Sequence, residues 1–455
     1  MADQLLLKGG HVVTMDSALG DFPTGDVLIE GDTIAQVGPD LEADGAEVID
    51  VSGDIVIPGF IDSHRHTWET AIRGSAPNAT LDDYFVEILD SFAPVYRPED
   101  VYASNLAGSL ECINAGITTL LDWSHINNTP EHPDAAIRGL QESGIRGVYA
   151  YGSANTSLAD YWFESSIAIP ADDVRRVHDT YFASNGGLLT MALATRGPGF
   201  CKPEVVREEW NLARELGLPI TVHVAMGRLA GRFGMVKQLS EMGLLGPDTT
   251  YIHSCYLSDE EWELVRDSGG TVSVAAQVEL QMGHGQPPTA PCIAHDLRPS
   301  LSVDVVTTVP GDMFTQMRAA FGAERVLVNS EAWQADVEIP EDTITARDAL
   351  QMGTINGAHV VGLEDQTGSL TPGKKADVVV IGGSDINTAP VIDPVATVVL
   401  AADVSNVDTV IIGGKIHKRN GKMIADISRA VGLVNSSRDY LVGQIENRKE
   451  AWLPV

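Results

Sequence analysis

Residues 58–66 read Pro58-Gly59-Phe60-Ile61-Asp62-Ser63-His64-Arg65-His66, an apolar run that ends in two histidines separated by one residue. Because side chains alternate between the two faces of a β-strand, His64 and His66 point the same way if this run is a strand. Two imidazoles at one strand end can bind a single metal ion. A surface or hydrogen-bonded histidine is the alternative for either residue taken alone.

Beyond this stretch, apolar runs alternate with amphipathic segments such as residues 203–216 and 259–267. The strand-like runs lie at residues 117–121, 147–151, 188–193, 220–224, 250–252, 271–274, 301–303 and 326–328. Repeated alternation of strand and helix predicts a parallel (β/α)8 barrel of the TIM type, with its active site at the carboxyl ends of the strands. His223 and His253 lie at or near the ends of such runs, as His64 does.

Short apolar runs separated by Gly and Asp turn signals occupy residues 5–37, and the pattern returns at residues 368–380 and 410–414. This punctuation is typical of short antiparallel strands. We therefore expect an α/β protein in which both termini build one small β-sandwich domain, from residues 1–57 and 363–425. The barrel is expected to span residues 58–362, and residues 426–455 to form a helical tail packed on it.

The composition limits the classes of partner. At 455 residues the chain is longer than one hydrophobic core usually is, and its 44% hydrophobic and 20% charged residues are typical of a globular enzyme. A formal net charge of −33 argues against a nucleic-acid or anionic-membrane partner, because both would be repelled over most of the surface. The expected partner is a small molecule.

Cysteine spacing and hydropathy indicate the compartment. Cys112, Cys201, Cys255 and Cys292 are far apart and form no Cys-x-x-Cys pair, so neither a zinc knuckle nor a disulfide framework is predicted. The first residues resemble no signal peptide, and no segment reaches the roughly 18 apolar residues of a membrane span. A cytoplasmic protein with reduced thiols is expected.

A metal ion that activates water needs a few nitrogen or oxygen ligands and an open coordination position. His64, His66, His223 and Asp304 can supply such a set, because Asp304 ends the apolar run at residues 301–303. Taken without the histidines, Asp304 is better explained as a helix N-cap or a turn residue.

Further stretches resemble one known family. They are Glu111-Cys112-Ile113-Asn114-Ala115-Gly116-Ile117-Thr118-Thr119-Leu120-Leu121-Asp122 and residues 312–318, 346–358, 368–370 and 373–377. With the histidine pair, they make the chain similar to the amidohydrolase superfamily, in the branch of cytosine, guanine and adenosine-type deaminases and chlorohydrolase-like triazine hydrolases. The resemblance runs nearly from end to end.

This resemblance implies a metal-dependent hydrolase acting on a C–N bond of a planar, aminated N-heterocycle. It implies His64, His66, His223 and Asp304 as ligands of one divalent ion, with zinc expected and ferrous iron open. Asp304 would also accept a proton from water, and His253 would polarise the substrate. For His253, a hydrogen-bonded core histidine is the alternative. Residues 188–196 contain no lysine that could bridge a second ion.

Met226 departs from the family pattern. Deaminases of this branch usually carry a glutamate three residues after the strand-5 histidine, where this chain has Met226. Methionine cannot transfer a proton. Either another acid, with Glu279 as one candidate, takes this role, or the reaction is a different one, such as amide or cyclic-imine hydrolysis, dechlorination or rearrangement. A solvated loop carboxylate is the alternative for Glu279, and a non-catalytic scaffold is the alternative for the whole chain.

Five residues that follow strand-like runs are predicted to contact the substrate: Trp68, Glu69, Trp123, His125 and His284. A tryptophan ring beside the metal can stack on a planar heterocycle, and packing within the wall is its alternative. Barrels of this kind frequently assemble as dimers or tetramers, so a homo-oligomer is expected.

Overall fold

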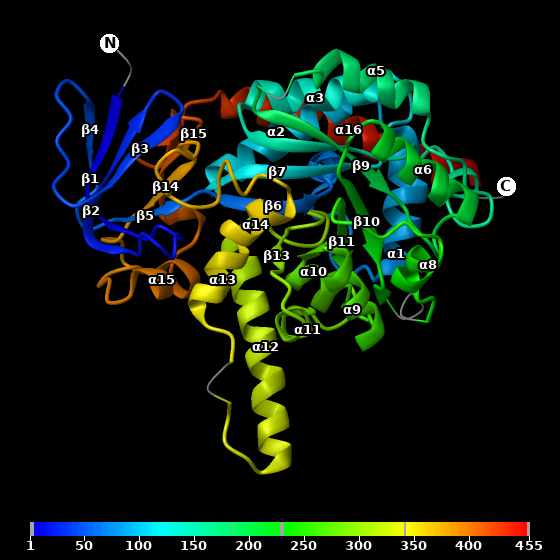
Figure 1. Cartoon of the computed structure of the whole chain (residues 1–455). Coiled ribbons are helices and arrows are strands. Elements are labelled where there is room, and N and C mark those ends of the chain that lie inside the picture. The colour runs from blue at the N-terminus through cyan, green and yellow to red at the C-terminus, as the bar shows by residue number, and fades with distance from the viewer. Residues whose placement is uncertain (1–3, 185, 228–231, 341–342, 453–455) are drawn as a thin grey trace.

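The computed structural model describes residues 4–184, 186–227, 232–340 and 343–452. Eight strands, each parallel to the next, form a barrel in chain order (Figure 1). They are β6 (Phe60–Arg65), β7 (Ile117–Ser124), β8 (Arg146–Tyr151), β9 (Leu189–Thr195), β10 (Ile220–Val224), β11 (Thr249–His253), β12 (Thr271–Val274) and β13 (Ser300–Leu301). The predicted (β/α)8 barrel is confirmed.

Helices connect the strands and cover the outside of the barrel (Figure 1). They include α2 (Pro98–Asn114), α3 (Glu131–Ser143), α5 (Ala171–Tyr181), α6 (Pro203–Glu215), α8 (Met235–Glu241), α9 (Asp259–Ser268), α12 (Met313–Ala335), α13 (Ala346–Met352) and α14 (Ile355–Val360). Local chemistry sets their ends. Helix α9, for example, begins where the Ser258 side chain accepts a hydrogen bond from the Glu261 amide, and it ends at Gly269, which adopts a φ of 76°.

Further helical segments occupy the connections. They are η1 (Thr67–Ile72), α1 (Leu81–Tyr84), η2 (Phe85–Phe92), η3 (Ala93–Val95), α4 (Leu158–Tyr161), α10 (Ala276–Gln281), α11 (Thr289–Ala294), α15 (Pro394–Ala396), η4 (Thr397–Ala401) and η5 (Val404–Asn406). The first of them follow β6 directly, so the chain after the histidine pair stays at the carboxyl end of the barrel.

The barrel closes between its first and last strands. Strand β13 is only two residues long, and the ladder resumes where Arg65 and Asp304 pair as a parallel bridge. The Asp304 amide donates to the His64 carbonyl at 3.0 Å, and the His66 amide donates to the Asp304 carbonyl at 2.8 Å. These backbone bonds bring three predicted metal ligands to one point of the barrel rim.

Both chain ends build a second, mixed sheet beside the barrel (Figure 1). Its strands are β1 (Gln4–Val12), β2 (Phe22–Glu30), β3 (Thr33–Gly38), β4 (Glu47–Asp50), β5 (Ile55–Pro58), β14 (Val378–Ile381), β15 (Val407–Ile412), β16 (Lys415–Arg419) and β17 (Lys422–Met423). Antiparallel pairing of β5 with β14 joins the two ends of the chain. The last helix, α16 (Ile427–Trp452), contacts α2 on the barrel. The predicted boundaries between the units stay a prediction.

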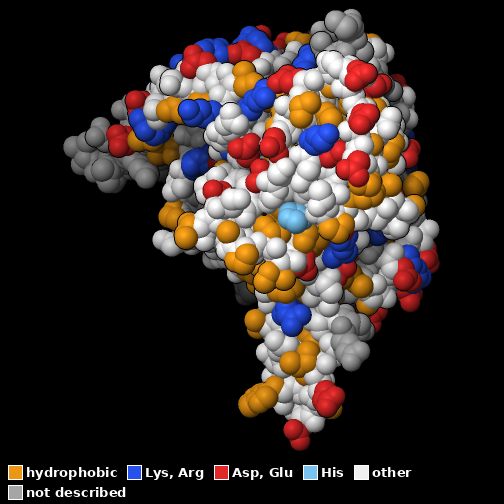
Figure 2. Space-filling model, turned by 90° about the vertical axis from the view of Figure 1, so that its left-hand side faces the viewer, with side chains coloured by type: hydrophobic (Ala, Val, Ile, Leu, Met, Phe, Trp, Pro, Cys, Tyr) orange, Lys and Arg blue, Asp and Glu red, His pale blue; other side chains and the backbone are white. Residues whose placement is uncertain are grey.

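One strand-like run is not a strand. Residues 326–328 lie inside α12, which begins where the Asp312 side chain accepts a hydrogen bond from the Thr315 amide. The far half of α12 projects from the body as an arm, and hydrophobic side chains lie along it (Figures 1 and 2). On this arm Val326 is 67% and Trp333 82% exposed. A short apolar run fits a strand or one turn of a helix, and its length alone does not separate them.

The cysteines and the hydropathy of the helices can be compared with the expectations from composition. All four cysteines are free in the structure. Within the described residues, no helix combines the length and the apolarity that a membrane crossing requires.

A buried ion pair links the barrel to the second sheet. Arg146, the first residue of β8, donates to both Asp377 carboxylate oxygens, at 2.7 and 3.0 Å. The Gly413 amide also donates to this carboxylate at 2.8 Å, so both ions have several partners. Asp377 belongs to the stretch at residues 373–377 that the resemblance singled out, and this pairing gives that stretch a structural role.

Replacing Asp377 by Asn should destabilise the protein by about 3–5 kcal/mol, because it leaves the Arg146 guanidinium buried without its counter-ion. Urea unfolding followed by fluorescence and far-UV circular dichroism measures this loss. The matched control is Asp248→Asn, which breaks the partly exposed pair with Arg214 and should cost less than about 1 kcal/mol. Equal unfolding midpoints for the two variants would contradict the proposed role of the buried pair.

Candidate metal centre

Four strand ends bring one cluster of ligand atoms together. His64 is the last residue but one of β6, His223 lies in β10, His253 is the last residue of β11, and Asp304 follows β13. One ligand atom from each of these buried residues lies within 4.8 Å of all the others. His66 completes the group, because its Nε2 lies 3.3 Å from Asp304 Oδ1. The structure therefore brings the four predicted ligands and His253 into one centre.

Nitrogen atoms of three histidines surround the Asp304 carboxylate. Oδ1 lies 3.1 Å from His64 Nε2, and Oδ2 lies 3.6 Å from His253 Nε2. His223 Nε2 is 3.1 Å from His64 Nε2. The imidazole rings of His66 and His223 are nearly parallel, with centroids 5.5 Å apart. Convergence of imidazole nitrogens on one carboxylate is the arrangement that a divalent ion requires.

Burial sets the charge of these groups. It lowers the pKa of His64 to about 3, and with the neighbouring His64 it holds the pKa of His223 well below its usual range. At Asp304 burial acts to raise the pKa, but hydrogen bonds with His64 and His66 outweigh it and hold that pKa well below its ordinary value. Neutral imidazoles and an ionised carboxylate are the forms that bind metal, so the donor set fits a divalent ion.

His66 differs from the other imidazoles. Burial acts to lower its pKa, but the hydrogen bond to Asp304 outweighs burial and raises it. Its Nδ1 lies 3.0 Å from the Trp123 carbonyl oxygen, which fixes the plane of the ring. A ligand imidazole held through its other nitrogen is typical of metal sites.

The backbone is strained where it presents two of these side chains. His253 has a φ of 68° and Asp304 a φ of 67°, in the left-handed region that residues other than glycine seldom adopt. Such conformations cost about 1–3 kcal/mol each and persist where surrounding structure enforces them. Here the closed barrel enforces them, and the strain turns both side chains toward the centre.

Glu279 lies behind His253. Its Oε1 lies 3.1 Å from His253 Nδ1 and accepts a hydrogen bond from the Ala275 amide at 2.8 Å. Burial raises the pKa of Glu279 well above its ordinary value, and the side chain is fully buried. The alternative of a solvated loop carboxylate is therefore wrong.

A narrow cavity opens in front of the cluster. Three of the residues predicted to contact the substrate, Trp123, His125 and His284, line it, as Met226 does. Both ring nitrogens of His284 are buried, and no described residue forms a hydrogen bond with them. Trp68 lies outside the lining, and its ring packs edge-to-face on His125 with centroids 5.4 Å apart. Its position fits the packing alternative.

Glu69 also lies behind the cavity wall. The Tyr84 hydroxyl donates to its Oε1 at 2.5 Å, and the Thr307 hydroxyl donates to its Oε2 at 3.0 Å. The side chain is fully buried, and burial raises the pKa of Glu69 to about 7. Tyr84 itself lines the cavity. Sequence reasoning missed Tyr84, because no motif or strand end marks it.

An apolar chamber of about 530 Å³ adjoins the cavity. The two spaces share five lining residues: Leu81, Phe85, Phe200, Met226 and Met282. Phe85 packs edge-to-face on Trp162 with centroids 5.2 Å apart, which makes this part of the wall aromatic. A cation also reaches the cavity, but the Arg196 guanidinium is paired with Glu209 at 2.6 Å.

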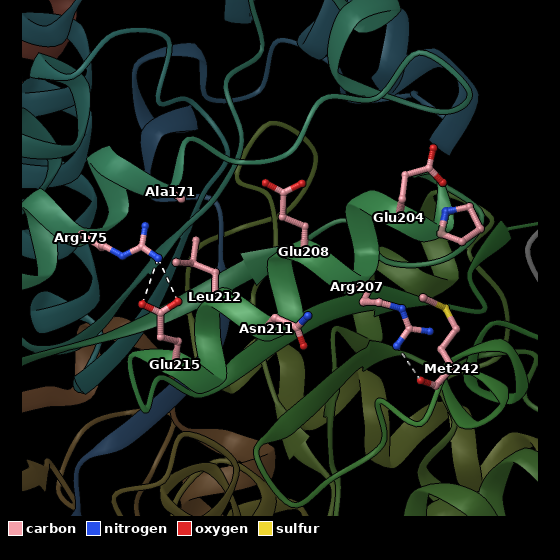
Figure 3. A pocket seen from close by; sticks show the side chains of 10 residues that line it. Ala171, Arg175, Glu204, Arg207, Glu208, Asn211, Leu212, Glu215 and Met242 are labelled. Atoms are coloured by element: carbon pink, nitrogen blue, oxygen red, sulfur yellow. Dashed lines mark hydrogen bonds and ion pairs between the residues drawn. The ribbon is translucent and has the colours of Figure 1, made fainter.

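Another hollow, of about 620 Å³, lies at the surface along α5 and α6 (Figure 3). Arg175 there pairs with Glu215 at 2.9 Å, and Arg207 donates to the Met242 carbonyl at 3.1 Å (Figure 3). Exposed pairs of this kind are solvated and contribute little energy. None of the metal-cluster residues lines this hollow, so the chemistry belongs to the cavity at the strand ends.

Comparisons with known proteins agree with the sequence resemblance. The model of the amidohydrolase family matches residues 55–417. The 5'-deoxyadenosine deaminase of Methanosarcina mazei is 26% identical, over 98% of this chain and 100% of that protein. The 5-methylthioadenosine/S-adenosylhomocysteine deaminase of Symbiobacterium thermophilum is 28% identical, over 91% of this chain and 93% of that protein.

Solved structures share the fold. An adenosine deaminase from Xanthomonas campestris with bound zinc superposes with a TM-score of 0.83 and 21% identity, over 97% of this chain and 99% of the other. Atrazine chlorohydrolase from Arthrobacter aurescens, complexed with zinc, gives a TM-score of 0.85 and 23% identity, over 95% of this chain and 100% of the other. At this identity the likeness shows the fold.

The purified protein should bind one divalent ion per chain. His223→Ala should weaken that binding by more than about tenfold, because losing a ligand costs at least as much as losing a residue that orients one. Metal analysis after dialysis against a chelator series measures the effect. His178→Ala, on α5, is the control and should keep the metal content of the original chain. Equal metal content in both variants would rule out His223 as a ligand.

Proposed function

From the premise that the chain belongs to the amidohydrolase family, we propose that it removes the exocyclic amino group of an adenine-like heterocycle as ammonia. The observation that carries this proposal is the cluster of imidazoles and the Asp304 carboxylate at the closed end of a cavity. The chain is a hydrolase of C–N bonds, and its curated relatives include deaminases of 5'-deoxyadenosine and methylthioadenosine.

We assign His64, His66, His223 and Asp304 to one divalent ion. A bound ion of this kind lowers the pKa of water from about 15.7 to about 7, which supplies a nucleophile at neutral pH. Zinc is the proposed ion, because the donor set suits it and two structural neighbours contain it, although ferrous iron suits the same donors. A homo-oligomeric assembly and a cytoplasmic location stay predictions.

We assign the proton transfer from water to Asp304 and the stabilisation of substrate charge to His253. Asp304 takes the proton that the attacking water releases, because its carboxylate is ionised and lies at the centre of the cluster. His253 faces the cavity and stabilises charge that develops on the substrate. Glu279 does not line the cavity, so we assign it to positioning: it orients the His253 ring through Nδ1.

The shape of the site supports a substrate with a small reacting end and an apolar body. The cavity at the cluster is narrow, whereas the adjoining chamber of about 530 Å³ is lined by side chains such as Phe85, Phe200 and Met226. Trp123 and His125 offer flat surfaces near the reacting end, where a planar heterocycle can stack. We therefore place the ring against these aromatics and its substituent in the chamber.

A second candidate reaction is the displacement of a group that needs no proton, such as chloride. Met226 favours it, because this side chain lines the cavity at the position where related deaminases carry an acid. The same fold is found in an atrazine chlorohydrolase. Product analysis separates the two reactions, since one releases ammonia and the other chloride.

The metal-replete protein should release ammonia from at least one member of a panel of aminated purines, pyrimidines, pterins and triazines. Asp304→Asn should lower kcat by about 10²–10⁴-fold, because it removes the acceptor of the water proton. A coupled ammonia assay and ion chromatography for chloride measure both products. Release of chloride without ammonia would replace deamination by dechlorination, and no product from any compound would contradict both reactions.

Glu279→Gln should lower kcat by about 10–100-fold, because an amide orients the His253 ring less strongly than a carboxyl group does. The substrate KM should stay within about threefold, since Glu279 does not line the cavity. Steady-state kinetics on the best substrate of the panel measure both values. Glu260→Gln, in an exposed pair with Lys237, is the control. A rise in KM alone would place Glu279 in substrate binding.

A further inference from the structure

A deaminase must move more protons than Asp304 alone can carry. The ring nitrogen of the substrate gains one proton, and the amino group gains another before it leaves as ammonia. In related deaminases an acid at the position of Met226 carries protons between water and the ring. Met226 lines the cavity here and cannot do so. Another group at the cavity wall must take this role.

We propose that the Tyr84 hydroxyl, backed by the buried carboxyl group of Glu69, relays protons to the substrate in place of the missing acid. This inference rests on the proposed deamination. It makes Tyr84 a catalytic residue that meets the substrate, and Glu69 a proton source that acts only through Tyr84.

The position of Tyr84 is well defined. It ends α1, lines the same cavity as His66 and Asp304, and is only 7% exposed. Helix α1 is fixed at its start, where Thr80 and Asp83 form a capping box. The Leu81 amide also donates to the Met282 carbonyl at 3.2 Å, which ties α1 to the opposite wall. The Tyr84 side chain is therefore held in the cavity wall by a fixed helix, and its hydroxyl is bonded to Glu69.

Glu69 lacks the features of a structural carboxylate. In the part of the chain that the structure describes, its two oxygens accept hydrogen bonds only from the hydroxyls of Tyr84 and Thr307. Within the described residues, no lysine or arginine forms an ion pair with it, whereas the equally buried Glu209 is paired with Arg196. A buried carboxyl group without a cation is costly when ionised, which favours a group that exchanges its proton.

His284 is the competing proton carrier. It lines the cavity, and both of its ring nitrogens are buried without a hydrogen-bond partner among the described residues. Among those residues no acid is bonded behind His284 that could restore a proton after transfer, in contrast to Tyr84 and Glu69. His284 is better suited to hydrogen-bond the heterocycle and hold it in place.

The proton balance closes without a co-reactant. Tyr84 passes its hydroxyl proton to the ring nitrogen while the Glu69 proton moves to Tyr84. Water adds to the carbon and gives one proton to Asp304, which passes it to the amino group. As the C–N bond breaks and the amine leaves as ammonia, the second proton of the water returns through Tyr84 to Glu69.

The experiment combines loss and rescue in the metal-loaded full chain. Tyr84→Phe and Glu69→Gln should each lower kcat for ammonia release by about 10²–10³-fold. The double variant should lose little more, because both residues belong to one relay. Adding Met226→Glu to Tyr84→Phe should raise kcat at least tenfold above the value for Tyr84→Phe alone. Met226→Glu should not rescue Asp304→Asn, which removes a different proton acceptor.

Measurements besides activity separate the relay from a structural role. Metal content should be unchanged in Tyr84→Phe, and the product Kd from calorimetry should change far less than kcat does. Tyr149→Phe, which removes a buried hydroxyl bonded to Asn127 outside the cavity, is the matched control and should keep full activity. Should Tyr84→Phe fail to fold, Glu69→Gln with and without Met226→Glu supplies the same test.

The outcomes separate a failure of the deaminase function from a failure of the proton relay. No ammonia from the original chain would overturn the deaminase function itself. Ammonia release that falls less than threefold in Tyr84→Phe and Glu69→Gln would overturn the relay alone. So would a large loss that Met226→Glu leaves unrescued, because a missing proton carrier should be replaceable. A loss confined to His284→Ala would assign the role to that residue.

Discussion

Closure of the barrel between its first and last strands is the constraint on which the site depends. Two backbone hydrogen bonds join Asp304 to His64 and His66, and the side chains of the same residues meet in the proposed metal site. A closed barrel leaves no free strand edge, so these bonds are enforced by the whole ring of strands. Strand pairing around the barrel therefore holds the imidazoles and the carboxylate in contact, and it keeps Asp304 in a strained backbone conformation.

The surroundings of the cluster explain the charges that the chemistry needs. Burial keeps His64 and His223 neutral, and hydrogen bonds from His64 and His66 keep Asp304 ionised despite burial. Around this centre, the buried carboxyl groups of Glu69 and Glu279 are held by hydroxyls, an amide and an imidazole rather than by cations. Hydrogen bonds with His64 and His66 thus keep one acid ionised, whereas burial shifts the other two toward their protonated form.

Ligands and cavity come from different parts of the fold. The metal cluster is built on strand ends, which are rigid and follow from the barrel. The cavity wall, in contrast, comes largely from connections, with Tyr84 and Phe85 after the first strand and Phe200 after the fourth. Strand ends therefore supply the proposed ligand atoms, while the connections shape the space in front of them.

The residues alone predicted the barrel, because strand alternation is a local signal, whereas the four proposed ligands and the missing acid at Met226 followed from the resemblance to a known family. Sequence reasoning misread residues 326–328, since a three-residue apolar run carries no information about the helix around it. Only the tertiary structure placed Glu279 behind His253 and brought Tyr84 to the hydroxyl-bonded carboxyl of Glu69. These contacts join segments whose separation in the chain is bridged by packing alone, which no local pattern encodes.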